Sequence, residues 1–129
     1  MKDFIIVGLL GAGTVGGGVL KVLEKNAEKI AKEVGKPVRI TKVLDRHVDR
    51  LKQEYGDKYI FTDNADEVLE DKDIDIIVEL LGREHPAKEF IARAFANGKH
   101  VVTANKDVLA KFGSELFPLA HEHNCDFMF

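Results

Sequence analysis

The chain has 129 residues, of which 45% are hydrophobic and 32% are charged, with a formal net charge of −3. These values are typical of one soluble globular domain, and they exclude a disordered chain and a strongly basic nucleic-acid-binding protein. Cys125 is the single cysteine, so no intramolecular disulfide can form, and we expect a small buried hydrophobe in a cytoplasmic protein. The apolar run over residues 4–10 is too short to span a membrane.

The first half of the chain alternates short apolar runs rich in β-branched residues with longer stretches of helical period. We predict a strand over residues 3–10 and one long helix over 14–34, ended by Gly35 and Pro37. A strand over 38–44, a helix over 48–55 and a strand over 59–61 follow. Asn64 is placed to cap a brief helix that runs to residue 69.

The second half continues the alternation with a strand over residues 74–80 and a helix from Pro86 to Asn97, stopped by Gly98. A strand over 99–103 precedes two short helices, one beginning near Asn105 and one capped by Ser114. A last strand is expected over 125–129. Such alternation predicts an α/β fold, namely a Rossmann-type, doubly wound, mostly parallel six-stranded sheet with helices on both faces.

A glycine-rich loop stands between the first predicted strand and the first predicted helix, and it reads Gly11, Ala12, Gly13, Thr14, Val15, Gly16. This strand–loop–helix context is what a GxGxxG dinucleotide-binding loop requires. The first glycine permits a tight turn, the second lets the main chain approach a pyrophosphate, and the third lets the helix pack on the sheet. The amides at the helix start then face the phosphates. We therefore predict that all six residues bind NAD or NADP.

An acidic residue at the end of the second strand usually accepts a hydrogen bond from the adenosine ribose, and Asp45 is the candidate. It follows Gly16 by more residues than is usual, because the first helix is long. Arg46 and His47 adjoin it and could instead hold a 2′-phosphate. Asp45 could also serve only as a turn residue. The choice between NAD and NADP stays open.

Three segments together resemble the N-terminal NAD(P)-binding domain of homoserine dehydrogenase: residues 7–16 (VGLLGAGTVG), 73–82 (DIDIIVELLG) and 98–106 (GKHVVTANK). The resemblance covers essentially all 129 residues. It implies an oxidoreductase that reduces L-aspartate 4-semialdehyde to L-homoserine with NAD(P)H. The family's substrate and dimerisation domain, through which the parent enzyme would be a homodimer, is not found in this sequence. We therefore expect a fragment that binds cofactor without turnover.

The resemblance also implies roles for residues beyond the glycine loop. Gly82, Thr103, Ala104 and Asn105 would bind cofactor, the last three beside the nicotinamide ribose; Asn105 could equally cap the next helix. Lys106 would bind there too and act as the catalytic residue. A lysine in the first turn of a helix is electrostatically unfavourable, and such local conflicts concentrate at functional sites. Relatives usually carry a second glycine where this chain has Arg83, and often a basic residue where it has Leu44.

Other polar residues have plainer interpretations. Glu79 lies in a strand that should be buried, so it either reaches the strand's exposed end, accepts hydrogen bonds or contacts the cofactor. His100 is expected to be a hydrogen-bonded residue, and His121 and His123 are expected at the surface. No metal site, nucleic-acid partner or membrane partner is predicted. Another Rossmann dehydrogenase and a non-catalytic dinucleotide-sensing module are the competing functions.

Overall fold

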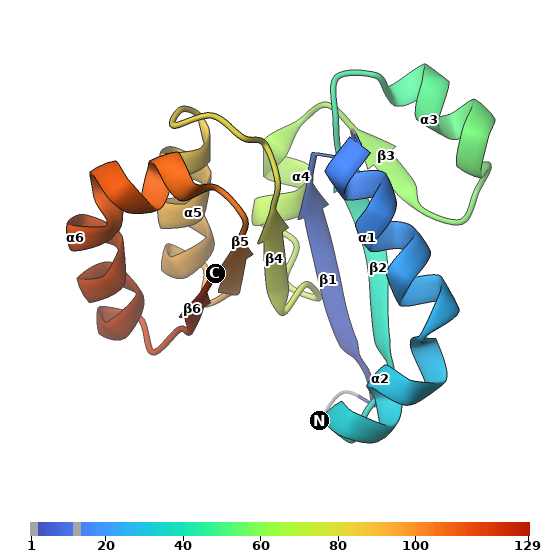
Figure 1. Cartoon of the computed structure of the whole chain (residues 1–129), viewed down its shortest axis with the longest axis horizontal. Helices are drawn as coiled ribbons and strands as arrows, with labels where there is room; N and C mark the ends of the chain where they lie inside the picture. Colours follow the sequence, from blue (N-terminus) through green and yellow to red (C-terminus); the bar gives the residue numbers. More distant parts are fainter. Residues whose placement is uncertain (1–2, 12–13) are drawn as a thin grey trace.

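The computed structural model describes residues 3–11 and 14–129, and at residues 14–17 it describes the backbone only. Its centre is a sheet of six strands in the order β3-β2-β1-β4-β5-β6, in which every pair of neighbours is parallel (Figure 1). The strands are β1 (Ile5–Leu10), β2 (Val38–Leu44), β3 (Ile60–Thr62), β4 (Ile76–Glu79), β5 (His100–Thr103) and β6 (Phe127–Met128). The predicted Rossmann-type architecture is confirmed, with an all-parallel sheet in place of a mostly parallel one.

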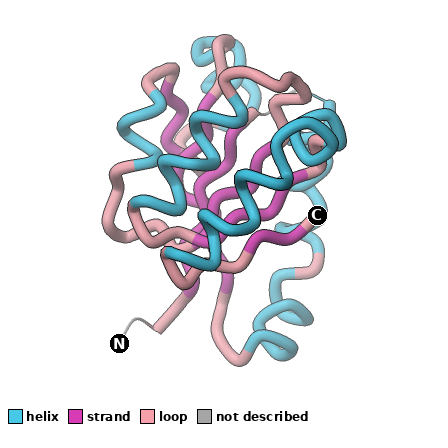
Figure 2. The backbone as a smooth tube through the Cα atoms, turned by 90° about the vertical axis from the view of Figure 1, so that its left-hand side faces the viewer, coloured by secondary structure: helices cyan, strands magenta, loops and turns pink. Residues whose placement is uncertain are grey.

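The helices form a layer on each face of the sheet. They are α1 (Thr14–Lys25), α2 (Ala27–Val34), α3 (Val48–Tyr55), α4 (Ala65–Leu69), α5 (Ala87–Ala96) and α6 (Lys106–Glu122). Side chains alternate across β1, so that Val7 and Leu9 pack with Leu20 of α1 and Leu51 of α3. Ile6 and Leu10 face the opposite core, which α4, α5 and α6 cover. Figure 2, turned toward that side of the molecule, shows helices lying in front of the strands.

The expected long first helix is wrong, because the chain breaks it at Asn26. The backbone of Asn26 leaves helical values at φ −111°, and its Nδ2 donates to the Val22 carbonyl at 3.0 Å. The Asn26 N–H also donates to the Val22 carbonyl at 3.0 Å, and the Ile30 N–H donates to the Asn26 carbonyl at 2.9 Å, so the interruption between α1 and α2 is confined to this residue. Asparagine favours non-helical backbone through such side-chain bonds. The predicted stop at Gly35 is confirmed, since Gly35 has φ +87° and its N–H donates to the Ala31 carbonyl at 2.9 Å.

The expected pair of helices after β5 is also wrong, because α6 is one helix. Ser114 lies within it and caps nothing, and Pro118 is also inside the helix. Val108, Leu116 and Ala120 are buried along a continuous stripe. Their burial offsets the cost of about 1 kcal/mol that Gly113 brings to a helix interior.

The remaining boundaries differ by small amounts. β2 and α3 have the predicted bounds, and α4 begins after Asn64, whose Oδ1 accepts from the Asp66 N–H at 3.0 Å. β4 and β6 are shorter than expected, and β3 is displaced by one residue. Within residues 3–11 and 14–129, no helix is long and apolar enough to cross a membrane.

Candidate functional site

The candidate site lies at the carboxyl edge of the sheet, where the loops after β1, β2, β4 and β5 emerge together (top of Figure 1). Backbone hydrogen bonds join the ends of these strands. The Gly11 N–H donates to the Leu44 carbonyl at 2.8 Å, and the Leu80 N–H donates to the Leu10 carbonyl at 2.9 Å. In open α/β sheets this edge, at the point where the strand order reverses, is where ligands bind. Here that point lies between β1 and β4.

Gly11 makes the turn between β1 and α1 in a way that other residues cannot. Its φ is +95°, and a Cβ added there would lie 3.3 Å from the Leu80 carbonyl oxygen. Both the backbone conformation and the neighbouring loop therefore require glycine. Such a close-packed turn is what a backbone cradle for a pyrophosphate needs.

The rest of the glycine loop leads into α1. Ala12 and Gly13 lie outside the described residues. α1 begins at Thr14, so its first turn holds three of the predicted phosphate-binding residues, Thr14, Val15 and Gly16. No acidic residue stands in this turn. The amides at a helix start have no partner within the helix, and together with the positive end of its dipole they favour an anion. These features fit a nicotinamide dinucleotide.

Asp45 follows β2 directly, at the same edge. One of its carboxylate oxygens, Oδ1, accepts from the His47 N–H at 2.8 Å. This bond gives Asp45 the turn role that the sequence left open. A carboxylate has further acceptor positions, so the turn role does not exclude a bond from a ribose hydroxyl.

A pocket of about 270 Å³ opens beside Asp45, between the loops after β2 and β4. Its walls are largely apolar, and charged side chains stand at its rim. The lining residues are Leu44, Asp45, Arg46, Asp63, Ala65, Leu81, Arg83, Pro86 and Phe90. Apolar walls with a few polar groups suit a flat heteroaromatic ring joined to a ribose. A wider hollow of about 640 Å³ on the α3 side of Arg46 has mainly polar walls.

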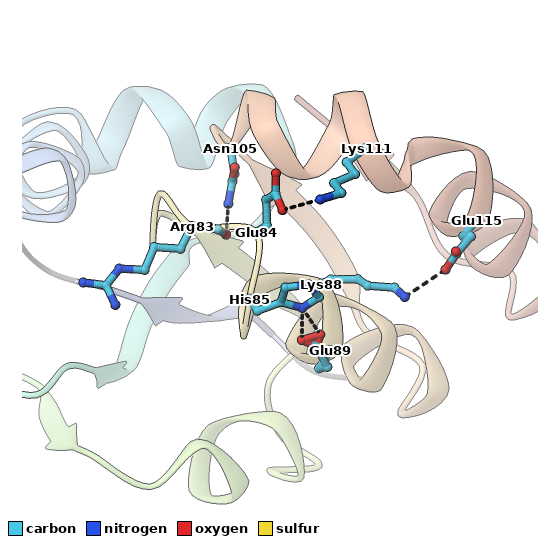
Figure 3. Close-up of polar contacts among 8 residues, drawn as sticks. All are labelled: Arg83, Glu84, His85, Lys88, Glu89, Asn105, Lys111 and Glu115. Atoms are coloured by element: carbon cyan, nitrogen blue, oxygen red, sulfur yellow. Dashed lines mark hydrogen bonds and ion pairs between the residues drawn. The ribbon is translucent and has the colours of Figure 1, made fainter.

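Arg83 lines this pocket together with Arg46. Figure 3 shows its side chain pointing away from the ion pairs of α5 and α6. Gly82, just before it, has φ +76°, and a Cβ added there would meet nothing within 4 Å. The loop beyond is anchored by two pairs that reach α6 and α5, namely Lys111–Glu84 and His85–Glu89, and the pair Lys88–Glu115 joins α5 to α6.

The loop after β5 holds the second group of predicted residues. Thr103 and Asn105 are buried, whereas Ala104 and Lys106 are exposed. The Asn105 Oδ1 accepts from the Val108 N–H at 3.1 Å, so the predicted cap of the helix is confirmed. Lys106 is the first residue of α6, as expected. Its backbone therefore lies at the carboxyl edge of the sheet.

Glu79 is the residue whose surroundings the sequence predicted least well. It is completely buried at the end of β4 and accepts hydrogen bonds from the Leu81 N–H and the Thr103 hydroxyl. Of the roles left open for it, hydrogen-bond acceptor is confirmed. The pocket walls Ala65, Leu81 and Phe90 were also missed, because they come from three elements far apart in the sequence.

The plainer interpretations hold. The Nδ1 atom of His100 accepts from the Asp126 N–H at 2.9 Å, and His121 and His123 are exposed. Cys125 is buried, and burial raises the pKa of its thiol. In the described part of the chain, no three His, Cys, Asp or Glu side chains are grouped so that they could hold a metal ion.

Comparison with known proteins identifies close relatives. The family model "Homoserine dehydrogenase, NAD binding domain" matches residues 11–129. A homoserine dehydrogenase of Methylobacillus glycogenes is 48% identical over 115 residues, which are 89% of this chain and 28% of that protein. The homoserine dehydrogenase of Bacillus subtilis (strain 168) is 41% identical over 97% of this chain and 29% of its own length.

Solved structures agree with these relatives. The crystal structure of a homoserine dehydrogenase from Thiobacillus denitrificans matches with a TM-score of 0.92 and 45% identity. That match covers 98% of this chain and 29% of the other. The chain thus spans less than a third of the length of the relatives it matches.

Proposed function

The chain belongs to the family of homoserine dehydrogenase NAD-binding domains, and from this premise we propose that its 129 residues form the cofactor domain of such an enzyme. The resemblance expected from the sequence is confirmed. Membership of the family makes NAD or NADP the cofactor. We propose which residues hold the cofactor, which substrate the complete enzyme reduces and how its subunits assemble.

The observation that carries the proposal is the pairing of the Gly11 turn with the apolar pocket beside Asp45. The turn and the first turn of α1 would hold the pyrophosphate through backbone amides. The pocket would bind the adenosine half, and its lining residues include Leu81 and Arg46. Asp45 would accept a bond from the ribose 2′-hydroxyl of NAD, whereas Arg46 would pair with the 2′-phosphate of NADP.

The loop after β5 would face the reacting half of the cofactor. When bound, the reduced cofactor supplies a hydride to the carbonyl carbon of the substrate. Thr103, Ala104 and Asn105, with Gly82 across the edge, would orient the nicotinamide ribose. Lys106 would hold the carbonyl oxygen and deliver the proton that turns it into an alcohol.

The complete enzyme would reduce L-aspartate 4-semialdehyde to L-homoserine in the cytoplasm, as a homodimer assembled through its remaining residues. Because the chain covers only 28% of its relative from Methylobacillus glycogenes, we expect the substrate contacts in the remainder. The 129 residues would then bind cofactor without turnover.

Titration of the chain with NADH and NADPH tests the first part of the proposal. The chain contains no tryptophan, so the fluorescence of the reduced nicotinamide can be followed without interference from the protein. We expect saturable binding of at least one cofactor and no oxidation of it when aspartate semialdehyde is added. Failure to bind either cofactor would overturn the proposal, and steady-state turnover would contradict the division of labour.

Lys106→Ala in the complete enzyme tests the catalytic assignment. We expect kcat/KM to fall by about 100-fold or more, within the range of general acid–base catalysis, with little change in cofactor affinity. Lys111→Ala is the matched control, because Lys111 is an exposed lysine on the same helix that pairs with Glu84 at 3.1 Å. An effect within about threefold for both variants, or roughly 0.7 kcal/mol, would reduce Lys106 to a structural residue.

A further inference from the structure

Glu79 is a buried acid that the proposed chemistry does not use. Its exposed fraction is 0%, and it is the one fully buried carboxylate among residues 3–11 and 14–129. Burying a carboxylate is costly unless hydrogen bonds replace its water. A hydrophobic residue would fit a buried strand end at lower cost, so the acid needs another explanation.

Both oxygens of the Glu79 carboxylate are occupied by donors. Oε2 accepts from the Leu81 N–H at 2.7 Å, and Oε1 accepts from the Thr103 hydroxyl at 2.6 Å. Glu79 and Thr103 are register partners on the neighbouring strands β4 and β5, so their side chains lie side by side on one face of the sheet. In the described part of the chain no ion pair involves Glu79. Its hydrogen bonds therefore hold two uncharged groups, the Leu81 amide and the Thr103 hydroxyl, and do not neutralise a positive charge.

The hydrogen bonds continue from Thr103 and return to the loop after β4. The Thr103 hydroxyl oxygen accepts from the Asn105 N–H at 2.9 Å. The Asn105 Nδ2 donates to the Arg83 carbonyl at 2.6 Å, a bond drawn in Figure 3. Because Leu81 and Arg83 belong to one short loop, the bonds close into a circuit through Glu79.

This circuit joins the two parts of the site that a dinucleotide would contact at once. Leu81 and Arg83 line the pocket proposed for adenosine. Asn105 caps α6, and the first residue of that helix is Lys106. A ligand that fills only the adenosine pocket meets one of these loops, whereas a whole dinucleotide meets both.

We propose that Glu79 is a positioning residue, which holds the loop 80–83 and the start of α6 in fixed relation and so places the nicotinamide half of the cofactor against Lys106. The inference rests on the proposed function, because it requires a dinucleotide at this edge. Loss of the carboxylate should then weaken binding of the whole dinucleotide more than binding of its adenosine half, because the adenosine half meets only the loop 80–83. A residue that only stabilised the fold would affect both halves alike.

The test compares two ligands on the same chain. The first is whichever of NADH and NADPH binds the wild-type chain more tightly. The second is the corresponding ADP-ribose, 2′-phosphorylated if NADPH is used, which lacks the nicotinamide. Affinities are measured by calorimetry for the wild type and for Glu79→Gln, whose amide keeps the shape but replaces one acceptor by a donor.

We expect the dissociation constant of the dinucleotide to rise about tenfold in Glu79→Gln, as the loss of a bond to a charged acceptor implies. The dissociation constant of the ADP-ribose should rise by a clearly smaller factor, about threefold or less, because this ligand meets only the loop 80–83. Thr103→Val removes the hydroxyl that links Glu79 to Asn105, so it should show the same pattern. Because Thr103 is also proposed to lie beside the nicotinamide ribose, its result supports the circuit only in agreement with Glu79→Gln. Thr103→Ser keeps the hydroxyl and should restore the wild-type ratio of the two affinities.

Asp75→Asn is the matched control, because Asp75 is also a carboxylate next to β4, at the opposite end of the strand. It accepts from the Ile6 N–H at 2.9 Å. It should lower stability without changing the ratio of the two affinities. Equal losses for both ligands in Glu79→Gln and Thr103→Val, or no loss in either, would overturn the inference. A wild-type chain that binds the ADP-ribose and the dinucleotide equally would overturn it too, whereas a chain that binds neither would refute the proposed function on which it rests.

Discussion

Replacing Gly11 by alanine adds one methyl group where β1 turns into α1. With φ at +95°, a residue other than glycine costs about 1–2 kcal/mol. The added Cβ would lie 3.3 Å from the Leu80 carbonyl oxygen, and moving that backbone costs about 1 kcal/mol more. Restricting the unfolded chain returns about 0.4–1 kcal/mol. The free energy of unfolding should therefore fall by about 2 kcal/mol.

Gly35→Ala is the control that separates these effects. Gly35 also has a positive φ, +87°, but a Cβ there would meet nothing within 4 Å. The free energy of unfolding of Gly35→Ala should fall by about 1 kcal/mol or less, since only the backbone cost applies. Urea unfolding followed by circular dichroism measures both losses. Titration with the reduced cofactor should show affinity weakened at least about tenfold for Gly11→Ala and unchanged for Gly35→Ala.

If Gly11→Ala lost no more stability than Gly35→Ala and still bound the cofactor as the wild type does, both expectations would be refuted. The turn would then be neither strained by a side chain nor a cradle for the pyrophosphate. A stability loss without a loss of affinity would support the close approach of the added Cβ to Leu80 and refute the role of the turn in binding the pyrophosphate.

Three further predictions follow from single contacts. Asp45→Ala should weaken NADH by roughly 1.5–3 kcal/mol and NADPH by less in parallel titrations; small, equal losses would leave Asp45 a turn residue only. Lys99 is buried, and its Nζ donates to the carbonyls of Ile74, at 2.9 Å, and Asp71. Lys99→Met should therefore lower the free energy of unfolding by about 2–3 kcal/mol. A change below about 0.5 kcal/mol would contradict this. Burial, and the bond that the Tyr59 hydroxyl donates to Glu24 at 2.5 Å, raise the pKa of Tyr59 above its ordinary value of 10.0. Because the folded pKa is the higher one, stability is full below pH 10 and declines above it; Tyr59→Phe should make that decline shallower in urea melts, and an unaltered slope would rule the contact out as its cause.

The sequence predicted the fold well where strand and stop signals are local. β2 has the expected bounds because a run of β-branched residues starts just after Pro37, and α3 ends as expected at Tyr55, just before Gly56. The predictions failed where one side chain outweighs periodicity, as Asn26 does between α1 and α2. They also failed in α6, where packing of Leu116 and its neighbours overrides the helix-breaking character of Gly113.

The site was predictable to the extent that it depends on position along a strand or helix. Asn105 could be expected to cap α6 because an asparagine preceding a helix does so by its own chemistry. The bonds of Glu79 depend on the register between β4 and β5, which sets Thr103 beside it. The pocket wall formed by Phe90 depends on how α5 lies on the sheet. Neither register nor helix placement can be read from one sequence.

The all-parallel order of the sheet also determines how fast it can assemble. β1 is one of the two central strands, and its Val7 pairs with Ile40 on one side and with Ile76 on the other. Parallel neighbours are always separated by a crossover, so these contacts form late and require closure of long loops. Topologies dominated by such contacts fold slowly. We expect the half containing β1, β2 and β3 to collapse first. The apolar side chains of Ile6 and Leu10 then stay accessible to other molecules until β4 and α5 cover them. The yield of refolding should therefore fall as the chain concentration rises.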